Sequence, residues 1–276
     1  MLVGLIGAGI QQSRSPAMHE SEGRAHGLDY EYRLLDLDLL EDGNDLAQLL
    51  SRCEREGFSG LNITHPCKQA VLAHLTGVSD EVAALEAANT VLLREGERIG
   101  HNTDWSGFAQ SLRRGLPHAA MQEVVQLGAG GAGAATAFAA LTLGTGHLVI
   151  FDINHQRAQQ LAERLNAHFG AARAEAGEDI EAAMAAAQGL IHATPTGMDR
   201  HPGLPLAAEL LRPAIWVAEV VYFPLETELL RAARAAGCRT LDGGGMAVFQ
   251  AAEAFRLFTG MTPDTERMLQ HFESMR

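Results

Sequence analysis

The chain has few cysteines and no excess of positive charge, and each of these absences excludes a class of protein. Cys53, Cys67 and Cys238 lie far apart with no C-x-x-C pair, which excludes a disulfide framework and fits reduced thiols. A net charge of −13 argues against nucleic acid or an anionic membrane as the main partner, because either would favour a basic face. We therefore expect no nucleic-acid partner and no membrane partner.

Leader, metal and hydrolase motifs are also missing. No apolar run reaches membrane-spanning length, and the chain opens at Leu2 with a strand-like run rather than a basic leader, so we expect a cytoplasmic protein. His65 and Cys67 are two residues apart, but no second pair completes a tetrahedral set, and we expect no metal. Ser59 and Ser106 lie near glycines without a complete G-x-S-x-G motif, which argues against a serine hydrolase.

The 276 residues do contain short apolar runs that alternate with helix-like segments, and 47% of the residues are hydrophobic. This length and composition allow two domains, each with its own core. The alternation predicts an α/β fold. The strand-like runs are residues 2–6, 30–35, 58–63, 124–127, 148–151, 189–192 and 215–221, with a hairpin over 89–93 and 98–100 and a last short strand at 240–242.

Two domains are expected from this order. The first covers residues 1–104 and is completed by helices within 246–276, and the second covers residues 105–245. Gly243–Gly245 is expected to be a flexible turn before the apolar-striped helix that follows.

The segment Val124–Asp152 carries the most informative motif. It reads as a βαβ unit with G-x-G-x-x-G at its first turn, the pattern that binds the pyrophosphate of a dinucleotide at a helix N-terminus. Gly128 allows the tight turn, Gly130 lets the backbone approach the pyrophosphate, and Gly133 lets the helix pack close to the strand. The residues of this turn that are expected to bind the cofactor are Gly128, Gly130, Gly131, Ala132 and Gly133.

Two further positions bear on nucleotide binding. Gly7-Ala8-Gly9 begins a similar pattern, but Gln12 occupies the third glycine position, so we expect no dinucleotide there. Asp152 can accept hydrogen bonds from the adenosine ribose and repels a 2′-phosphate, which favours NAD over NADP. Arg157 follows in the next helix and could instead serve NADP or stack on adenine.

Six motifs in order along nearly the whole chain resemble those of the shikimate dehydrogenase family. Asp152 stands where NADP-dependent members usually carry Asn-Arg-Thr, so the chain looks similar to the NAD-dependent quinate/shikimate dehydrogenase branch. The motifs are Ser13-Arg14-Ser15-Pro16, Asn62–Lys68, Asn102-Thr103-Asp104, Gly128–Gly133, Ala193–Met198 and Met246-x-x-x-Gln250.

The resemblance implies an N-terminal α/β substrate domain, a Rossmann-type doubly wound NAD-binding domain, and a cleft between them. It also implies reversible oxidation of the C3 hydroxyl of shikimate, or the equivalent hydroxyl of quinate, with hydride transfer to NAD. Lys68 and Asp104 match the catalytic pair, and an amine hydrogen-bonded to a carboxylate can take the hydroxyl proton. A nearby carboxylate also favours the charged amine, and the protonation state of Lys68 stays open.

The remaining expected site residues follow from the same resemblance, and the substrate is a small hydroxy acid. Those expected to bind it are Ser13, Ser15, Asn62, Thr64, Asn89, Tyr222 and Gln250. Those expected to bind the cofactor, besides the glycine turn, Asp152 and Arg157, are Thr194, Pro195, Met198, Val221 and Gly244.

Several departures from the family pattern leave alternatives open. His192 stands where asparagine often begins the Asn-Ala-Thr motif, and it either lies near the cofactor or completes a strand; the role of Cys67 is equally open. Gly244 and Gly245 replace bulkier residues, and Ser15 stands where quinate-using members can carry threonine, so shikimate ranks above quinate. The rivals are the same fold acting on a related cyclic acid such as an aminoshikimate, and a non-catalytic protein that binds NAD or a metabolite. Monomer and homodimer are both open.

Overall fold

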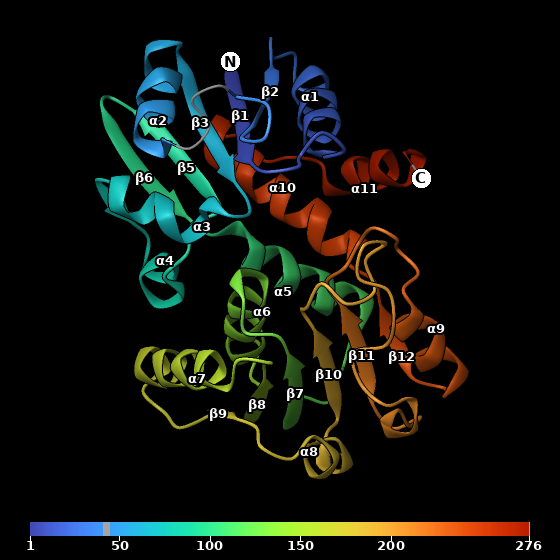
Figure 1. Ribbon diagram of the computed structural model, residues 1–276. Coiled ribbons are helices and arrows are strands. Elements are labelled where there is room, and N and C mark those ends of the chain that lie inside the picture. Colours follow the sequence, from blue (N-terminus) through green and yellow to red (C-terminus); the bar gives the residue numbers. More distant parts are fainter. Residues whose placement is uncertain (41–44, 276) are drawn as a thin grey trace. The chain divides into compact units, whose positions relative to one another are not determined.

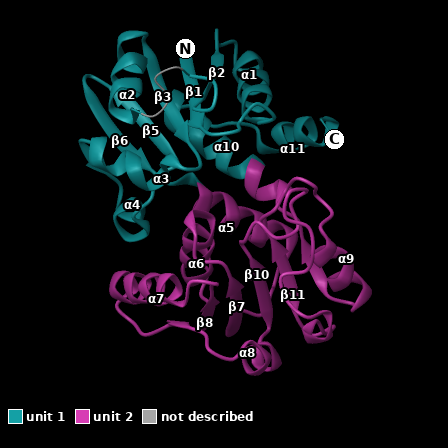
Figure 2. Cartoon of the chain, in the orientation of Figure 1, with its two compact units in different colours: residues 1–103, 248–276 teal, residues 104–247 magenta. Residues whose placement is uncertain are grey.

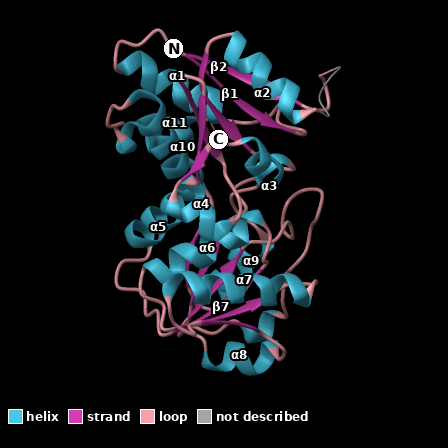
Figure 3. Cartoon of the chain, turned by 90° about the vertical axis from the view of Figure 1, so that its left-hand side faces the viewer, coloured by secondary structure: helices cyan, strands magenta, loops and turns pink. Residues whose placement is uncertain are grey.

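The computed structural model describes residues 1–40 and 45–275, which form two compact units (Figure 2). Unit 1 comprises Met1–Thr103 and Val248–Arg276, and unit 2 comprises Asp104–Ala247. The predicted mixed α/β fold is confirmed, and helices flank the strands of each unit (Figure 3). Among the described residues, none of the helices is both long and apolar enough to cross a membrane.

Unit 1 contains a mixed six-stranded sheet in the order β2-β1-β3-β5-β6-β4 (Figure 1). Strand β1 pairs in parallel with β2 and β3, whereas β5 pairs antiparallel with β3 and β6. The elements are β1 (Leu2–Gly7), α1 (Ser15–Ala25), β2 (Glu31–Asp36), α2 (Leu46–Arg55), β3 (Phe58–Ile63), α3 (Cys67–Ala70), η1 (Val71–His74), β4 (Gly77–Val78), α4 (Asp80–Leu85), β5 (Thr90–Arg94), β6 (Glu97–His101) and α11 (Thr265–Ser274).

Two apolar clusters cover the sheet of unit 1. One contains Leu49, Leu50 and Cys53 of α2 together with residues of β1 and β3. The other contains Phe255 and Phe258, which pack on Val3, Leu5 and Tyr32 of β1 and β2. These two phenylalanines belong to α10 (Gly244–Thr259), whose first residues belong to unit 2. The C-terminal segment therefore supplies part of the core of the N-terminal sheet.

Unit 2 contains an all-parallel six-stranded sheet in the order β12-β11-β10-β7-β8-β9. Its chain order doubles back at β7, which lies between β8 and β10, and ligands bind beyond the carboxyl ends of strands at such a point. The elements are α5 (Thr103–Gly115), β7 (Glu123–Leu127), α6 (Gly131–Thr142), β8 (His147–Phe151), α7 (His155–Phe169), β9 (Ala174–Ala176), α8 (Ile180–Ala186), β10 (Gly189–His192), η2 (Ala208–Leu210), β11 (Trp216–Glu219), α9 (Glu228–Ala235) and β12 (Arg239–Leu241).

The sheet of unit 2 is buried by helices. Met184 of α8 and Leu229 of α9 share one cluster with Val125 and Val217 of the sheet, so α8 and α9 cover the same face. Alanines occupy much of α6, including Ala135, Ala137 and Ala139, which are wholly buried. Such small side chains let the helix approach its neighbours closely.

The prediction that Gly243–Gly245 forms a flexible turn is wrong for its last two residues. Gly244 and Gly245 form the first turn of α10, and the Gly244 N–H donates to the Asp242 Oδ1 atom at 2.9 Å. A Cβ atom on Gly245 would lie 2.3 Å from the Ser111 hydroxyl, so α5 and this turn pack too closely for a side chain. Both glycines therefore lie in a helix, and Gly245 permits close helix packing.

Candidate functional site

The glycine turn after β7 has the geometry that a dinucleotide pyrophosphate requires. Gly128 has a φ of +102°, and a Cβ atom there would lie 2.5 Å from the Ala193 carbonyl oxygen. A Cβ atom on Gly133 would lie 2.2 Å from the Gly128 carbonyl oxygen, so α6 packs directly on the turn. Gly130 differs, because nothing lies within 4 Å of a Cβ atom built on it. The backbone at Gly130 therefore faces open space that a phosphate group can approach.

The N-terminus of α6 is suited to an anion. Gly130 is its N-cap residue and supplies no side-chain hydrogen bond, and the first turn contains no acidic residue. The first N–H groups of a helix have no partner within the helix, and the helix dipole favours negative charge there. Gly131 and Ala132 begin this turn. The residues present therefore fit the pyrophosphate of a dinucleotide.

A buried glutamine, which none of the sequence motifs contains, holds the turn closed. Gln126 lies in β7 and is wholly buried. Its Nε2 atom donates to the carbonyl oxygens of Gly128 at 2.9 Å and Gly133 at 2.7 Å, while its Oε1 atom accepts from the Thr136 hydroxyl at 2.9 Å. The signal that could have found it is a polar residue inside an otherwise apolar strand.

Asp152 follows β8 and contacts the same turn. Its Oδ2 atom accepts from the Ala129 N–H at 2.8 Å, and its Oδ1 atom accepts from the Asn154 N–H at 2.8 Å. A carboxylate has about four acceptor positions, so these two bonds leave acceptor capacity for ribose hydroxyl groups. Ile153 is fully exposed, and Arg157 is exposed in the first turn of α7.

The corresponding carboxylate in unit 1 is surrounded by donors from its own loop. Asp36 ends β2 and accepts from the N–H groups of Gly9 at 3.0 Å, Ile10 at 3.2 Å and Asp38 at 3.2 Å, and from Gln11 Nε2 at 2.9 Å. The hydrogen bond from Gln11, together with these backbone donors, holds the pKa of Asp36 below its usual range. The acceptor positions of Asp36 are thus used by the protein itself.

The other expected cofactor residues lie in loops at the carboxyl ends of β10 and β11 and at the start of α10. Thr194 is half-buried, Pro195 and Met198 are exposed, and Val221 is buried. All of these residues, with Gly244, belong to unit 2, which also contains the glycine turn and Asp152. The structure therefore places every residue expected to bind the cofactor in one compact unit.

Most residues expected to bind the substrate lie in unit 1. The Ser15 N–H donates to the Ser13 hydroxyl at 3.3 Å at the start of α1. Tyr32 contacts one of the expected residues, because its hydroxyl donates to Asn62 Oδ1 at 2.8 Å. Burial raises the pKa of Tyr32, which keeps this hydroxyl protonated. Tyr32 was not predicted as a site residue.

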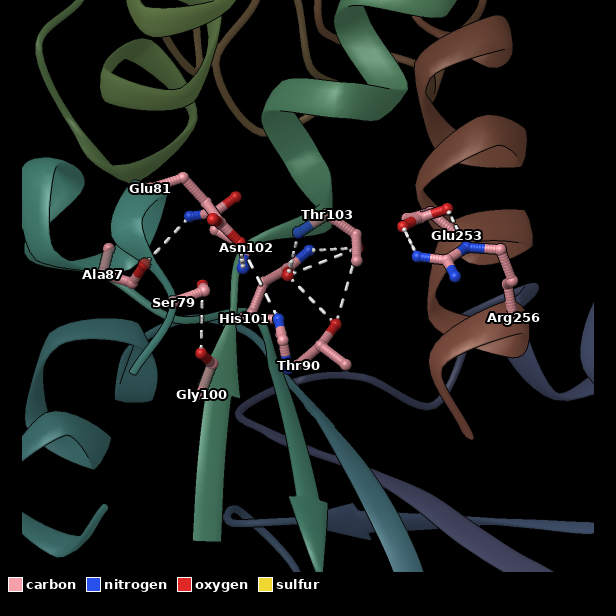
Figure 4. A network of polar contacts seen from close by, with 11 residues as sticks. Ser79, Glu81, Ala87, Thr90, Gly100, His101, Asn102, Thr103, Glu253 and Arg256 are labelled. Atoms are coloured by element: carbon pink, nitrogen blue, oxygen red, sulfur yellow. Dashed lines mark hydrogen bonds and ion pairs between the residues drawn. The ribbon is translucent and has the colours of Figure 1, made fainter. Parts of the chain in front are cut away.

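A polar network around Asn102 and Thr103 fixes the start of α5 (Figure 4). Asn89 Oδ1 accepts from the Thr103 N–H at 2.7 Å, and Asn89 Nδ2 donates to the Thr103 hydroxyl at 3.0 Å. Asn102 Nδ2 donates to the Ala87 carbonyl oxygen at 2.9 Å. Asp104 is the next residue and is 7% exposed. The backbone that leads into Asp104 is therefore held by buried hydrogen bonds rather than by a mobile loop.

Lys68 lies in α3, directly after the carboxyl end of β3. Its carbonyl oxygen accepts from the Ala88 N–H at 2.9 Å, while the Asn89 carbonyl oxygen accepts from the Ile63 N–H at 2.8 Å. Lys68 is half-buried, and it is the only lysine in the sequence. These backbone bonds place Lys68 beside the segment that carries Asn89. The pairing of Lys68 with Asp104 stays a prediction.

The remaining expected substrate residues lie in three places. Thr64 packs on the turn that contains Gly7, because a Cβ atom on Gly7 would lie 2.3 Å from the Thr64 Cγ2 atom. Gln250 lies in the part of α10 that belongs to unit 1, one helical turn before Ala254, which packs in the cluster with Tyr32. Tyr222 belongs to unit 2, follows Val221 and is 43% exposed. Unit 1 thus contains the expected substrate residues except Tyr222.

Comparison with known proteins gives family matches at both ends of the chain. Residues 5–91 match the shikimate dehydrogenase substrate binding domain, and residues 243–271 match the shikimate 5'-dehydrogenase C-terminal domain. The chain is 59% identical to a shikimate dehydrogenase (NADP(+)) of Streptomyces avermitilis, covering 97% of this chain and 93% of the relative. It is 50% identical to a quinate/shikimate dehydrogenase (NAD(+)) of Corynebacterium efficiens, covering 100% and 98%.

Solved structures with the same fold bind either nicotinamide cofactor. Quinate dehydrogenase from Corynebacterium glutamicum in complex with NAD superposes with a TM-score of 0.95 at 48% identity, over 99% of each chain. Shikimate 5-dehydrogenase from Thermus thermophilus in complex with NADP(H) and shikimate superposes with a TM-score of 0.86 at 35% identity, over 100% of each chain.

Proposed function

The chain belongs to the shikimate dehydrogenase family of pyridine-nucleotide oxidoreductases, and on that premise we propose that it reversibly oxidises the C3 hydroxyl of shikimate with NAD. The observation that carries the proposal is the joint presence of two sets of groups. Unit 1 contains hydroxyl and amide groups suited to a polyhydroxy acid, and unit 2 contains a glycine turn and acid suited to a dinucleotide. Unit 1 is accordingly the substrate domain, and unit 2 the cofactor domain.

Lys68 and Asp104 carry the proton chemistry in this proposal. When bound, the nicotinamide ring supplies the acceptor for the hydride that leaves C3. As the C–H bond breaks and the C3 oxygen becomes a carbonyl, the hydroxyl proton passes to the neutral amine of Lys68. Asp104 orients the amine and stabilises the ammonium that forms. In the reverse direction, the same ammonium returns the proton to the carbonyl oxygen.

The substrate is held by groups that donate or accept directional hydrogen bonds. Ser13 and Ser15 bind the carboxylate, while Asn62, Thr64 and Gln250 bind ring hydroxyl groups; Asn89 and Tyr222 complete the set. A site built from buried polar groups discriminates strongly against analogues that leave those groups unpaired. Tyr32 supports this specificity, because its hydroxyl fixes the orientation of the Asn62 amide.

NAD is favoured over NADP by the end of β8. Asp152 keeps acceptor capacity for the ribose and repels a 2′-phosphate, and the residue after it is the exposed and uncharged Ile153. Arg157 favours NADP instead, because it is exposed in the first turn of α7 and could pair with a 2′-phosphate. The Streptomyces relative named for NADP(+) makes this choice the first to test.

A steady-state assay with shikimate and quinate, each with NAD and NADP, tests the proposal. We expect the largest kcat/KM for shikimate with NAD, followed at the NADH absorbance band. Quinate is the second candidate substrate, supported by the relative of Corynebacterium efficiens. Turnover of an aminoshikimate alone would favour a related cyclic acid. Calorimetric binding of NAD without any turnover would replace the proposal with a non-catalytic binding protein.

A further inference from the structure

A buried histidine and glutamate lie beneath the loops that follow β10 and β11, and the mechanism above does not use them. His192 ends β10 and Glu219 ends β11, and both side chains are fully buried. The Nδ1 atom of His192 lies 2.8 Å and 3.0 Å from the two carboxylate oxygens of Glu219. The Nε2 atom lies 2.6 Å from the Thr194 hydroxyl oxygen. Both ring nitrogens of His192 are therefore committed to partners.

Glu219 receives several further hydrogen bonds. Its Oε1 atom accepts from the N–H groups of Val220 at 2.9 Å and Val221 at 3.0 Å, and its Oε2 atom accepts from the Thr227 hydroxyl at 3.0 Å. Thr227 is the N-cap of α9. A carboxylate with this many donors acts purely as an acceptor, so His192 must donate through Nδ1. The pair thus joins the β10 strand end to the turn after β11 and to α9.

This tautomer decides how the Thr194 hydroxyl is used. In the neutral ring, which carries its single proton on Nδ1, the Nε2 atom of His192 accepts, and the Thr194 O–H donates to it. The Thr194 oxygen also accepts from the Thr196 N–H at 3.3 Å. The only hydrogen of the hydroxyl is therefore directed into the protein. Toward a ligand, the half-buried Thr194 can then offer only an acceptor lone pair.

Thr194 lies next to the glycine turn. A Cβ atom on Gly128 would lie 2.5 Å from the Ala193 carbonyl oxygen and 3.0 Å from the Thr194 Cγ2 atom. β10 pairs with β7, which leads into that turn. Any shift of the Thr194 loop would therefore move atoms that touch the proposed pyrophosphate turn.

We infer that His192 and Glu219 are positioning residues for the dinucleotide: they hold the Thr194 oxygen as a fixed hydrogen-bond acceptor for an N–H or O–H group of the cofactor. The inference rests on the proposed function, because it requires a dinucleotide in unit 2. The physical reason is preorganisation, since a hydroxyl whose hydrogen is already directed inward loses no rotational freedom when the ligand donates to it. His192 acts only through Thr194 and touches no ligand.

The test is a set of dissociation constants for NADH, measured by fluorescence titration. H192N keeps an N–H donor near Glu219, but its side chain is too short to reach Thr194. T194V removes the hydroxyl and keeps the side-chain shape. We expect each single variant to raise the Kd about three- to tenfold, the range for one neutral hydrogen bond. In the T194V background, H192N should have no further effect, whereas T194S should stay within about twofold of the wild type.

The coupling between the two positions separates positioning from a general loss of stability. If H192N raised the Kd by the same factor with and without the Thr194 hydroxyl, or did not raise it at all, the inference would be overturned. Steady-state assays should show the KM for NAD rising while the KM for shikimate is unchanged. If H192N does not fold, the Kd values of T194V and T194S for NADH are compared instead. A wild-type Kd for T194V then overturns the inference.

A matched control is available in the same sheet. His147 begins β8, and its Nδ1 atom lies 3.1 Å from Glu123 Oε2, so it too is a histidine bonded to a glutamate. It lies at the amino end of its strand, opposite the cofactor loops, and H147N should leave the Kd unchanged. A wild-type chain that bound neither NADH nor NADPH would contradict the proposed function itself. Wild-type binding that none of the variants weakens would contradict only the inference.

Discussion

At the scale of the residue, the role of Lys68 is the most direct assignment to test. We expect K68A to lower kcat about 10²- to 10⁴-fold, the usual contribution of a positioned general base. The guanidinium of K68R stays protonated near neutral pH and cannot accept the hydroxyl proton, so this variant should be equally inactive. The measurement is NADH formation at saturating shikimate. Full turnover by K68A, with NAD binding unchanged in calorimetry, would contradict the assignment.

The uniqueness of Lys68 permits a second measurement on the same residue. Because the sequence has no other lysine, an amine-selective reagent can modify only this side chain and the N-terminus. Bound shikimate should slow the modification of Lys68 and leave that of the N-terminus unchanged. Equal rates for Lys68 with and without shikimate would show that the substrate does not cover the amine.

Asp152 gives a prediction about cofactor choice. D152A removes the carboxylate that repels a 2′-phosphate, and we expect the ratio of kcat/KM with NAD to that with NADP to fall about tenfold or more. D179N is a suitable control, because Asp179 caps α8 through hydrogen bonds from Glu181 and Ala182. Its ratio should match that of the wild type. An unchanged ratio for D152A would remove Asp152 from the explanation of cofactor preference.

Residues with chemical motifs could be predicted from sequence, whereas their supporting residues could not. The glycine turn and Asp152 follow one another at fixed spacing, so a local pattern identifies them. Tyr32 and Asn62 are 30 positions apart, and only the pairing of their strands with β1 brings them together. His192 and Glu219 are 27 positions apart on neighbouring strands. Such contacts depend on strand order, which the sequence pattern does not specify.

At the scale of the element, two glycines at the junction between β7 and α6 allow helix packing and cofactor binding to be tested separately. A Cβ atom on Gly133 would meet the backbone of Gly128, so G133A must shift the helix. We expect G133A to lose about 1–3 kcal/mol in the free energy of unfolding and to bind NADH more weakly. A Cβ atom on Gly130 meets nothing, so G130A should keep the melting temperature and weaken only NADH binding. Thermal unfolding and fluorescence titration give the two readouts. NADH binding by G130A as tight as in the wild type would argue against a pyrophosphate at this turn.

Apolar runs identified the longer strands and the short β12 (Arg239–Leu241), but not two other short strands. β4 (Gly77–Val78) and β9 (Ala174–Ala176) were not predicted, because two or three residues carry too little pattern to distinguish a strand from a loop. Gly244 and Gly245 were misread because glycine commonly marks turns. In α10, Gly245 is required instead by the close approach of Ser111, a contact between residues far apart in sequence.

At the scale of the whole molecule, His19 makes the folded state sensitive to mild acid. Its side chain is fully buried, and burial lowers its pKa from 6.5 to about 3. The unfolded chain therefore takes up a proton below about pH 6.5 that the folded chain rejects, so stability is present above that pH and is lost as the pH falls toward 3. One proton corresponds to about 1.4 kcal/mol per pH unit, or about 2 kcal/mol between pH 6.5 and pH 5.

Urea unfolding at a series of pH values measures this loss. H19F places an apolar ring among Tyr30, Tyr32, Phe255 and Phe258, and its free energy of unfolding should fall less steeply below pH 6.5. H74F, at a partly exposed position, should keep the wild-type slope. Parallel curves for H19F and the wild type would show that His19 does not cause the acid sensitivity.

The bonds made by Asp36 have a consequence for how nucleotide motifs are read. The N–H groups of Gly9 and Ile10 point at a carboxylate that the chain supplies from its own second strand, so this turn already contains a built-in anion. A phosphate arriving from solution would have to displace that charge and would be repelled by it. Each of the two glycine turns lies near an aspartate at the carboxyl end of the next strand, and in the first turn that aspartate accepts four hydrogen bonds from its own loop. Replacing Asp36 with a neutral residue would free the N–H groups of Gly9 and Ile10, and this turn could then bind an anion from solution.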